Sequence, residues 1–301
     1  MTVDEGHHYR RKPCESLAVS SSRENCGMSF SVLILTCNEE RNLASCIQSV
    51  EWCDDIVVLD SGSSDATIDI AASLGARVVR HPFVNFAAQR NWALCHIQFC
   101  HSWVFHLDAD ERFTPELAAE CRKVILEDGY SGFLVPSKMM LFGKWLRHAA
   151  AYPVYQTRLL KVGELWFEQV GHGQREASAK RGVGVLHEPY VHDSFNAGFD
   201  RWFEKHNAYS RAEAEQSLTR NESGRAAPPL AANVARFRRL KDLSRRMPCR
   251  PLAVWLYFYV LKRGFLDGRA GFTYCALRAI YQYMIDLKAA EIRFRRSEGA
   301  L

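Results

Sequence analysis

The chain has 301 residues, of which 48% are hydrophobic, 24% charged and 12% aromatic. This composition excludes wholesale disorder, collagen-like repeats and a disulfide mini-protein, and the length suits one large domain with an appendage. The net charge of +5 is unevenly spread. Residues from 220 onward carry 17 Lys and Arg against 6 Asp and Glu, a balance of +11, and the rest of the chain has a balance of −6. An acidic body and a basic tail both need an explanation.

Both ends of the chain and its cysteines bear on where the protein resides. Residues 1–28 are polar and have no apolar core, so we expect a disordered N-terminal leader rather than a signal peptide. The ten cysteines are scattered without a CxxC pair, which is typical of a reducing cytosol. The longest uncharged apolar run, residues 251–261, is shorter than the roughly 20 residues of a membrane-spanning helix.

The chain from residue 31 to about 126 alternates between strand and helix patterns. Apolar runs predict strands at 31–36, 55–59, 76–80 and 103–107. Periodic segments predict helices at 43–50, 67–74 and 85–97, and Thr114-Pro115 predicts the start of a fourth. This order predicts an α/β fold with a mostly parallel sheet covered by helices on both faces.

The pattern changes after residue 130. Short runs at 132–136, 156–162, 165–170 and 183–186 predict strands without intervening helices, and Gly163-Glu164 is typical of a tight hairpin turn. From Phe199 the sequence is helical, with a polar interruption at 217–229.

Acidic side chains follow three of the predicted strands. Glu39 and Glu40 follow the first, Asp60 the second, and Asp108-Ala109-Asp110-Glu111 the fourth. Ligands of parallel sheets bind beyond the carboxyl ends of the strands. The Asp108/Asp110 spacing suits Mg²⁺ or Mn²⁺, but by itself it is more often found in a solvated loop that caps the next helix. The position of the pair directly after a buried strand favours metal binding over the capping role.

Four segments in this order and spacing resemble the inverting family 2 glycosyltransferases of the GT-A fold: SVLILTCNEERNL, VVLDSGSSDAT, AAQRNWAL and FHLDADE. Three further segments, at 152–176, 187–214 and 263–285, resemble a bacterial branch that builds lipopolysaccharide core and exopolysaccharide. The resemblance implies a GT-A catalytic domain over 29–198 and a helical, basic and aromatic extension over 199–301.

The resemblance also implies a reaction. A nucleotide-diphosphate sugar, expected to be a UDP-hexose, donates its sugar with inversion to a glycan or lipid-linked acceptor. A carboxylate base removes the proton of the acceptor hydroxyl, and the diphosphate leaves on Mg²⁺ or Mn²⁺.

Residue roles follow from the matched motifs. Asp110 is the first metal ligand, and Asp108 is the second, nearer the ribose and diphosphate. The nucleotide-sugar site comprises Thr36, Asn38, Glu39, Asp60, Arg90, Asn91, Asp108 and Arg158. Two alternatives stay open: Asp60 as a turn residue that accepts local hydrogen bonds, and Arg90 as an exposed helix residue.

The catalytic base is assigned less directly, because this chain has VGHGQRE where relatives have a His-Glu pair. Glu176 is the first choice. His172 and Glu168 compete with it, and Glu188 is a weaker candidate.

The tail joins basic residues to apolar and aromatic ones. The basic residues are Arg236, Arg238, Arg239, Lys241, Arg245, Arg246, Arg250, Lys262 and Arg263, around the run 251–261. This mixture favours an anionic membrane surface, and hence a cytoplasmic protein held at the inner face of the membrane. The alternative is a helix that packs on the catalytic body or in a homodimer.

Three other functions fit the sequence less well. A nucleic-acid-binding protein would explain the basic tail but not the carboxylates at strand ends, so we expect no nucleic-acid partner. An inactive GT-A scaffold would have no need to keep the carboxylates of Asp108-Ala109-Asp110-Glu111, which are intact here. A glycoside hydrolase would need two facing carboxylates and no nucleotide pocket.

Overall fold

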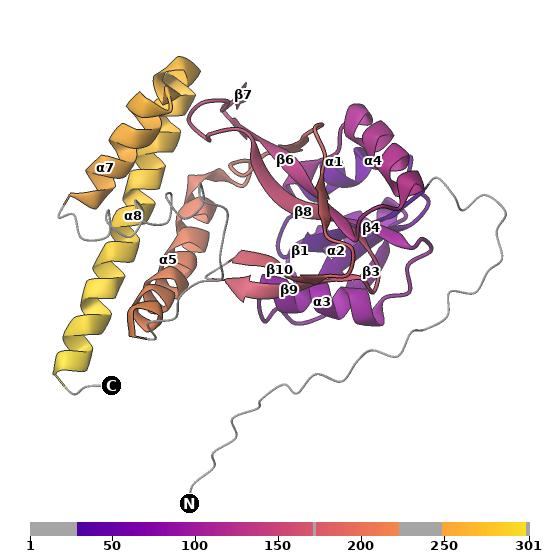
Figure 1. Ribbon diagram of the computed structural model, residues 1–301, viewed down its shortest axis with the longest axis horizontal. Coiled ribbons are helices and arrows are strands. Elements are labelled where there is room, and N and C mark those ends of the chain that lie inside the picture. The colour runs from indigo at the N-terminus through magenta and orange to yellow at the C-terminus, as the bar shows by residue number, and fades with distance from the viewer. Residues whose placement is uncertain (1–28, 171–172, 223–248, 299–301) are drawn as a thin grey trace, which may run out of the picture.

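The computed structural model describes residues 29–170, 173–222 and 249–298 (Figure 1). The predicted leader therefore lies outside the described residues. The first half of the chain forms β1 (Ser31–Thr36), α1 (Leu43–Gln48), β2 (Ile56–Asp60), α2 (Thr67–Ser73), β3 (Arg77–Arg80), α3 (Phe86–His96), β4 (Trp103–Asp108), β5 (Glu111–Arg112) and α4 (Pro115–Glu127). These elements confirm the predicted alternation. Side chains start two of the helices: Asn85 accepts from the Ala88 N–H, and Thr114 accepts from the Leu117 N–H.

The second half adds strands and then long helices. They are β6 (Gly132–Leu141), β7 (Lys144–Trp145), β8 (Val154–Lys161), β9 (Leu165–Val170), β10 (Gly173–Ala179), β11 (Val183–Val185), β12 (Tyr190–His192), α5 (Gly198–Glu222), α7 (Arg250–Leu256), a π-helix η1 (Tyr257–Leu261), a 3₁₀-helix η2 (Gly264–Asp267) and α8 (Gly268–Ser297).

The main sheet is mixed rather than parallel throughout. Its strands lie in the order β3-β2-β1-β4-β8-β6-β12-β5, with β7 and β11 paired to β6. The first four are parallel, whereas β8 runs antiparallel to both β4 and β6. Helices α1, α2 and α4 pack on one face and α3 on the other, as predicted.

The predicted hairpin at Gly163-Glu164 is wrong. A turn does form there, but β8 already has β4 and β6 as neighbours on its two sides. The next strand, β9, pairs instead with β10 in a separate two-stranded sheet. That small sheet lies against α3 through Leu165 and Phe167 (Figure 1).

The C-terminal helices pack against the body and against each other. In Figure 1, α5 lies between the catalytic body and the pair formed by α7 and α8. The buried Asp267 carboxylate joins the pair to the body, because it accepts from the backbone N–H groups of His148 and Ala149 at 2.9 and 2.8 Å. No helix in the described part of the chain is long and apolar enough to cross a membrane.

Candidate active site

Parallel register brings the predicted ligand-binding residues to one edge of the sheet. Thr36 lies opposite Asp60, and Leu35 lies opposite Asp108. The Thr36 hydroxyl donates to the Asp60 carboxylate at 3.3 Å. The carboxyl ends of β1, β2 and β4 therefore meet at one place, as the sequence predicts.

Two buried arginines hold the Asp108 carboxylate. Arg90 Nη2 donates to Oδ1 and Arg158 Nη2 donates to Oδ2, each at 2.8 Å. Arg158 also pairs with Glu111, which is fully buried and accepts from the Asp108 backbone N–H at 2.9 Å. Arg90 is thus not an exposed helix residue. Since charges in a protein interior need partners, the four side chains form one interdependent cluster.

Burial and charge act in opposite directions on these carboxyl groups. Burial alone would raise the pKa of Asp108, but the guanidinium groups of Arg158 and Arg90 outweigh it and hold the pKa below its ordinary value. Burial raises the pKa of Glu111 to about 7, because its attraction to Arg158 does not fully compensate for desolvation. Asp108 is consequently ionised at neutral pH.

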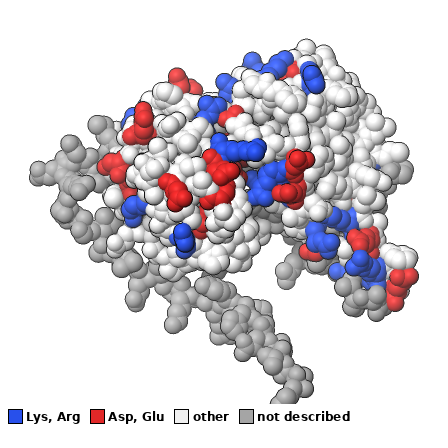
Figure 2. Space-filling model, turned by 180° about the vertical axis from the view of Figure 1, so that it is seen from behind, with Lys and Arg blue, Asp and Glu red and all other residues white. Residues whose placement is uncertain are grey.

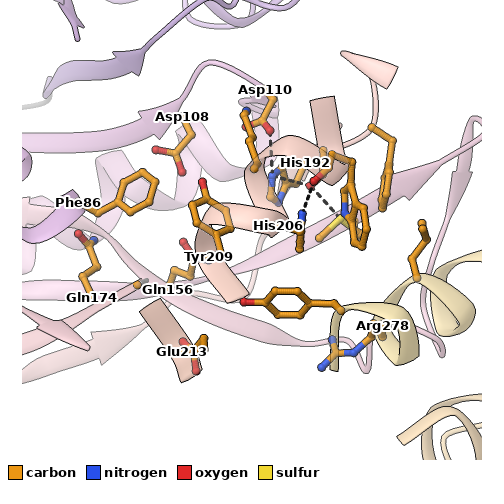
Figure 3. Close-up of a pocket in the computed structure, with 18 of the residues that line it drawn as sticks. Phe86, Asp108, Asp110, Gln156, Gln174, His192, His206, Tyr209, Glu213 and Arg278 are labelled. Carbon is orange, nitrogen blue, oxygen red and sulfur yellow. Dashed lines mark hydrogen bonds and ion pairs between the residues drawn. The ribbon is translucent and has the colours of Figure 1, made fainter. Parts of the chain in front are cut away.

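Asp110 faces the cavity and has a histidine beside it (Figure 3). Its Oδ2 atom lies 3.5 Å from His192 Nε2, which also contacts the Ser194 hydroxyl at 2.7 Å. Burial would lower the pKa of His192, but the Asp110 charge outweighs burial and raises that pKa to about 9. Pairing of β12 with β5 places His192 opposite Glu111. The position of His192 cannot be read from the sequence, because its partner strand β5 is only two residues long.

A carboxylate oxygen and an imidazole nitrogen on one wall of the cavity fit a divalent metal. An imidazole ligand favours Mn²⁺ over Mg²⁺, which is held mainly by oxygen atoms. Among residues 29–170, 173–222 and 249–298, no three His, Cys, Asp or Glu side chains converge as a complete metal site. Asp110 and His192 would therefore hold the ion together with ligands from elsewhere, such as diphosphate oxygens.

Two predicted nucleotide-site residues make local contacts instead of facing the cavity. The Asp60 Oδ2 atom accepts from the backbone N–H groups of Gly62 and Ser63 at 2.9 and 3.0 Å, which is the turn alternative left open by the sequence. Asn38 has a left-handed backbone, with φ of 55°, and its Oδ1 atom accepts from the Ser64 N–H. Neither side chain lines the cavity.

Of two other predicted nucleotide-site residues, Glu39 lines the cavity and Asn91 does not. The Glu39 Oε1 atom pairs with Lys205 Nζ of α5 at 2.8 Å. The Asn91 amide donates to the Phe167 carbonyl at 2.9 Å and accepts from the Phe167 N–H at 3.0 Å, so it fixes β9 to α3.

The four candidate bases differ in their position relative to the cavity. Glu176 of β10 is half-buried, lines the cavity and accepts a hydrogen bond from the Thr157 hydroxyl. Glu168 is exposed outside the cavity and pairs with Arg175. Glu188 does not line the cavity either. His172 lies outside the described residues.

Helix α5 closes the site on the side away from the sheet. The cavity has a volume of about 1740 Å³, and Lys205, His206, Tyr209 and Glu213 line it from this helix. In Figure 3 the Tyr209 hydroxyl points toward Asp108, with Glu213 one turn further along. The sequence gives no sign of the roles of Lys205 and Glu213, because their neighbours in space are far away in the chain.

Comparisons with known proteins relate this chain to glycosyltransferases. Residues 31–174 match the family described as Glycosyl transferase family 2. The lipopolysaccharide core biosynthesis glycosyltransferase LpsC of Rhizobium meliloti is 28% identical over 216 residues, which cover 65% of this chain and 73% of LpsC. An uncharacterised glycosyltransferase of Rickettsia typhi is 33% identical over 120 residues, 38% of this chain. That match spans 40% of the Rickettsia protein's own length.

Two solved structures are also similar. Glucosyl-3-phosphoglycerate synthase from Mycobacterium tuberculosis, in complex with Mn²⁺, UDP and glucosyl-3-phosphoglycerate, is 18% identical with a TM-score of 0.44, covering 67% of this chain and 82% of that one. S. aureus TarS 1-349 in complex with UDP-GlcNAc is 14% identical with a TM-score of 0.44, covering 90% and 92%.

Proposed function

We propose that the chain is a family 2 glycosyltransferase of the GT-A fold, since residues 31–174 match that family. Within the family it is an inverting, metal-dependent hexosyltransferase of lipopolysaccharide or exopolysaccharide synthesis. The donor is a nucleotide-diphosphate sugar, with UDP as its nucleotide. The acceptor is a glycan or a lipid-linked saccharide. The 28% identity with LpsC, over an alignment that covers 73% of that protein, supports the lipopolysaccharide core as the pathway.

One observation carries the proposal. At the carboxyl end of β4, Asp108 is oriented by two buried arginines while Asp110 faces a large cavity beside His192. This fixed carboxylate on the cavity wall supports a metal-bound diphosphate as the ligand of this end of the cavity. A metal held there by Asp110 and His192 would neutralise charge on the leaving diphosphate.

The chain's own residues account for the rest of the reaction. Glu176 is the carboxylate that accepts the proton of the acceptor hydroxyl, whose oxygen then attacks the anomeric carbon from the face opposite the diphosphate. The Thr157 hydroxyl orients Glu176 through its hydrogen bond. Lys205, beside Glu39 and near Asp110, adds positive charge on the leaving-group side.

We further propose that the protein works at the cytoplasmic face of a membrane. The described part of the tail exposes apolar side chains, among them Leu261 at 73% and Phe265 at 48%. Trp255, Phe258 and Tyr259 pack against α8 and the body, so the packed-helix alternative holds for those residues. The basic residues 236–246 lie outside the described residues.

A donor screen tests the proposed transfer. Purified protein is incubated with UDP-hexoses and Mn²⁺, and release of UDP is measured. We expect at least one UDP-hexose to be turned over, and Asp110→Ala to lose about 100-fold or more of that rate because its metal ligand is gone. The variant must retain the wild-type circular dichroism. Undiminished turnover by Asp110→Ala, or no metal dependence, would contradict the assignment.

A further inference from the structure

The cavity is larger than a nucleotide sugar requires and has two chemically different ends. Small-ligand pockets usually measure about 300–1,000 Å³, whereas this cavity measures about 1740 Å³. One end lies at the carboxylates of the sheet edge. The other end is lined by α7, η1 and α8, through Arg250, Ala253, Val254, Leu256, Tyr257, Phe258, Leu261, Tyr274, Leu277, Arg278, Tyr281, Gln282 and Ile285. The second end is therefore mostly apolar and aromatic.

Two arginines line the apolar end. Arg250 pairs with Asp286 at 2.9 Å, whereas Arg278 stacks on an aromatic ring. The Arg278 guanidinium lies 4.0 Å above the Phe258 ring and donates to the Tyr274 hydroxyl at 3.3 Å. Figure 3 shows Arg278 on α8 across the cavity from the catalytic aspartates. A guanidinium on an aromatic face keeps its charge and its remaining N–H groups, so it suits a phosphate or carboxylate group of a ligand.

The apolar end opens to solvent through hydrophobic side chains. Leu256 and Leu261 both line the cavity and are exposed, at 45% and 73%. Outside the cavity the exposed surface continues over Leu252, Val260, Phe265 and Leu266, and Lys262 and Arg263 adjoin it. Figure 2 shows a largely uncharged face on this helical region, with charged side chains toward its ends. An exposed apolar surface of this kind marks a site of interaction.

One cavity therefore joins exposed leucines, the Arg278 guanidinium and the carboxylates around Asp110. An amphiphile whose anionic head bears the sugar hydroxyl to be glycosylated carries groups that complement all three.

We propose that the α7–η1–α8 end of the cavity is a lipid site. It binds the hydrocarbon chain of an amphiphilic acceptor, and Arg278 contacts the acceptor's anionic group. The inference rests on the proposed transfer reaction, whose acceptor it specifies. A second copy of the chain is a poorer occupant, because the site is a cavity continuous with the catalytic carboxylates and not a flat face. The remaining exposed leucines rest on the membrane from which the acceptor enters.

Binding of a simple amphiphile tests the site directly. Isothermal titration compares dodecyl phosphate, kept below its micelle concentration, with inorganic phosphate and with dodecyl maltoside. We expect dodecyl phosphate to bind at least about tenfold more tightly than inorganic phosphate, because only dodecyl phosphate fills the apolar end. Arg278→Gln should weaken dodecyl phosphate binding about tenfold and leave dodecyl maltoside unchanged.

A blocking variant and a matched control localise the binding. Ala253 lines the cavity from α7, and Leu252 is on the same helix but outside the cavity. Ala253→Phe should weaken both dodecyl ligands about tenfold by filling the space, while Leu252→Ser should bind them as the wild type does. Both variants should bind UDP with Mn²⁺ normally, which also verifies their folding.

Three results would overturn the lipid site: wild-type affinity of Ala253→Phe for dodecyl phosphate, equal affinity of the wild type for inorganic phosphate, or capture of dodecyl phosphate only when it is embedded in vesicles. If the wild type binds dodecyl phosphate but neither binds UDP nor turns over any UDP-hexose, the proposed function fails and the lipid site stands.

Discussion

At the residue scale, the two aspartates at the end of β4 have different surroundings. Both oxygens of Asp108 accept from buried guanidinium groups, so this carboxylate is fixed by Arg90 and Arg158. Asp110 has His192 at 3.5 Å and faces the cavity. The arginines therefore orient Asp108, and we infer that Asp110 is the carboxylate better placed to hold a metal.

The candidate catalytic bases also differ in their surroundings. Glu176 and Glu168 lie on the two strands of one small sheet, so their roles can be compared directly. We expect Glu176→Gln to lower the transfer rate about 100-fold or more, because the amide cannot accept the hydroxyl proton, with little change in UDP affinity. Glu168→Gln is the matched control, since Glu168 lies on the paired strand but outside the cavity. Steady-state kinetics and UDP titration measure both effects. Near-normal turnover by Glu176→Gln would move the base to another carboxylate of the cavity, such as Glu213.

At the element scale, short strands of the second half of the chain position the site residues. Strand β12 has only three residues, yet it pairs with β6 and β5 and so delivers His192 to Asp110. Strand β10 pairs with β9, and β9 is fixed to α3 by Asn91, which together place Glu176 on the cavity wall. Neither strand is long enough to be stable by itself, and both depend on their neighbours.

The attachment of the C-terminal helices to the body depends on the residue that precedes α8. Asp267 is 3% exposed and satisfies two backbone N–H groups and the His148 ring nitrogen. We expect Asp267→Ala to lower the free energy of unfolding by about 2–4 kcal/mol, because buried donors lose their acceptor. Glu291→Ala, which removes an exposed ion pair within α8, should cost less than about 0.5 kcal/mol. Urea unfolding measures the difference, and equal costs would contradict the anchoring role.

At the scale of the whole molecule, the charge and the apolar surface are arranged along one axis. The acidic sheet edge lies inside the cavity, and the exposed apolar residues of the C-terminal helices lie at its other end. A sugar donor and a membrane-borne acceptor would therefore enter the cavity from different ends.

This arrangement predicts reversible binding of the full chain to anionic vesicles. Each Lys or Arg near such a surface contributes about 1 kcal/mol, and the tail has a balance of +11. We expect the protein to sediment with phosphatidylglycerol vesicles at about 0.1 M salt and to be largely released at about 1 M salt, where charges are screened beyond roughly 3 Å. Neutral phosphatidylcholine vesicles are the control. Equal binding to both lipids, or no binding at low salt, would contradict an electrostatic membrane contact.

The sequence alone determined the α/β body and the place of its chemistry. Unbroken apolar runs identify buried strands such as β1 and β4 without knowledge of their partners, because burial on both faces requires them. The carboxyl ends of parallel strands then share one edge, so Asp108 and Asp110 could be predicted to lie there. The strand and helix predictions for residues 31 to about 126 were confirmed, because each depends mainly on residues a few positions apart in the chain.

Tertiary structure decided the contacts between distant residues. Whether Asp60 faces a ligand or its own turn, and whether Glu176 or Glu168 faces the cavity, depends on packing that periodicity does not encode. The hairpin prediction at Gly163 failed because β4 and β6 already pair with both edges of β8. His192 and Lys205 reach the acidic cluster only through chain folding, since Lys205 meets Glu39 across 166 residues. The functional site combines a locally encoded sheet edge with side chains that only the folded chain brings to it.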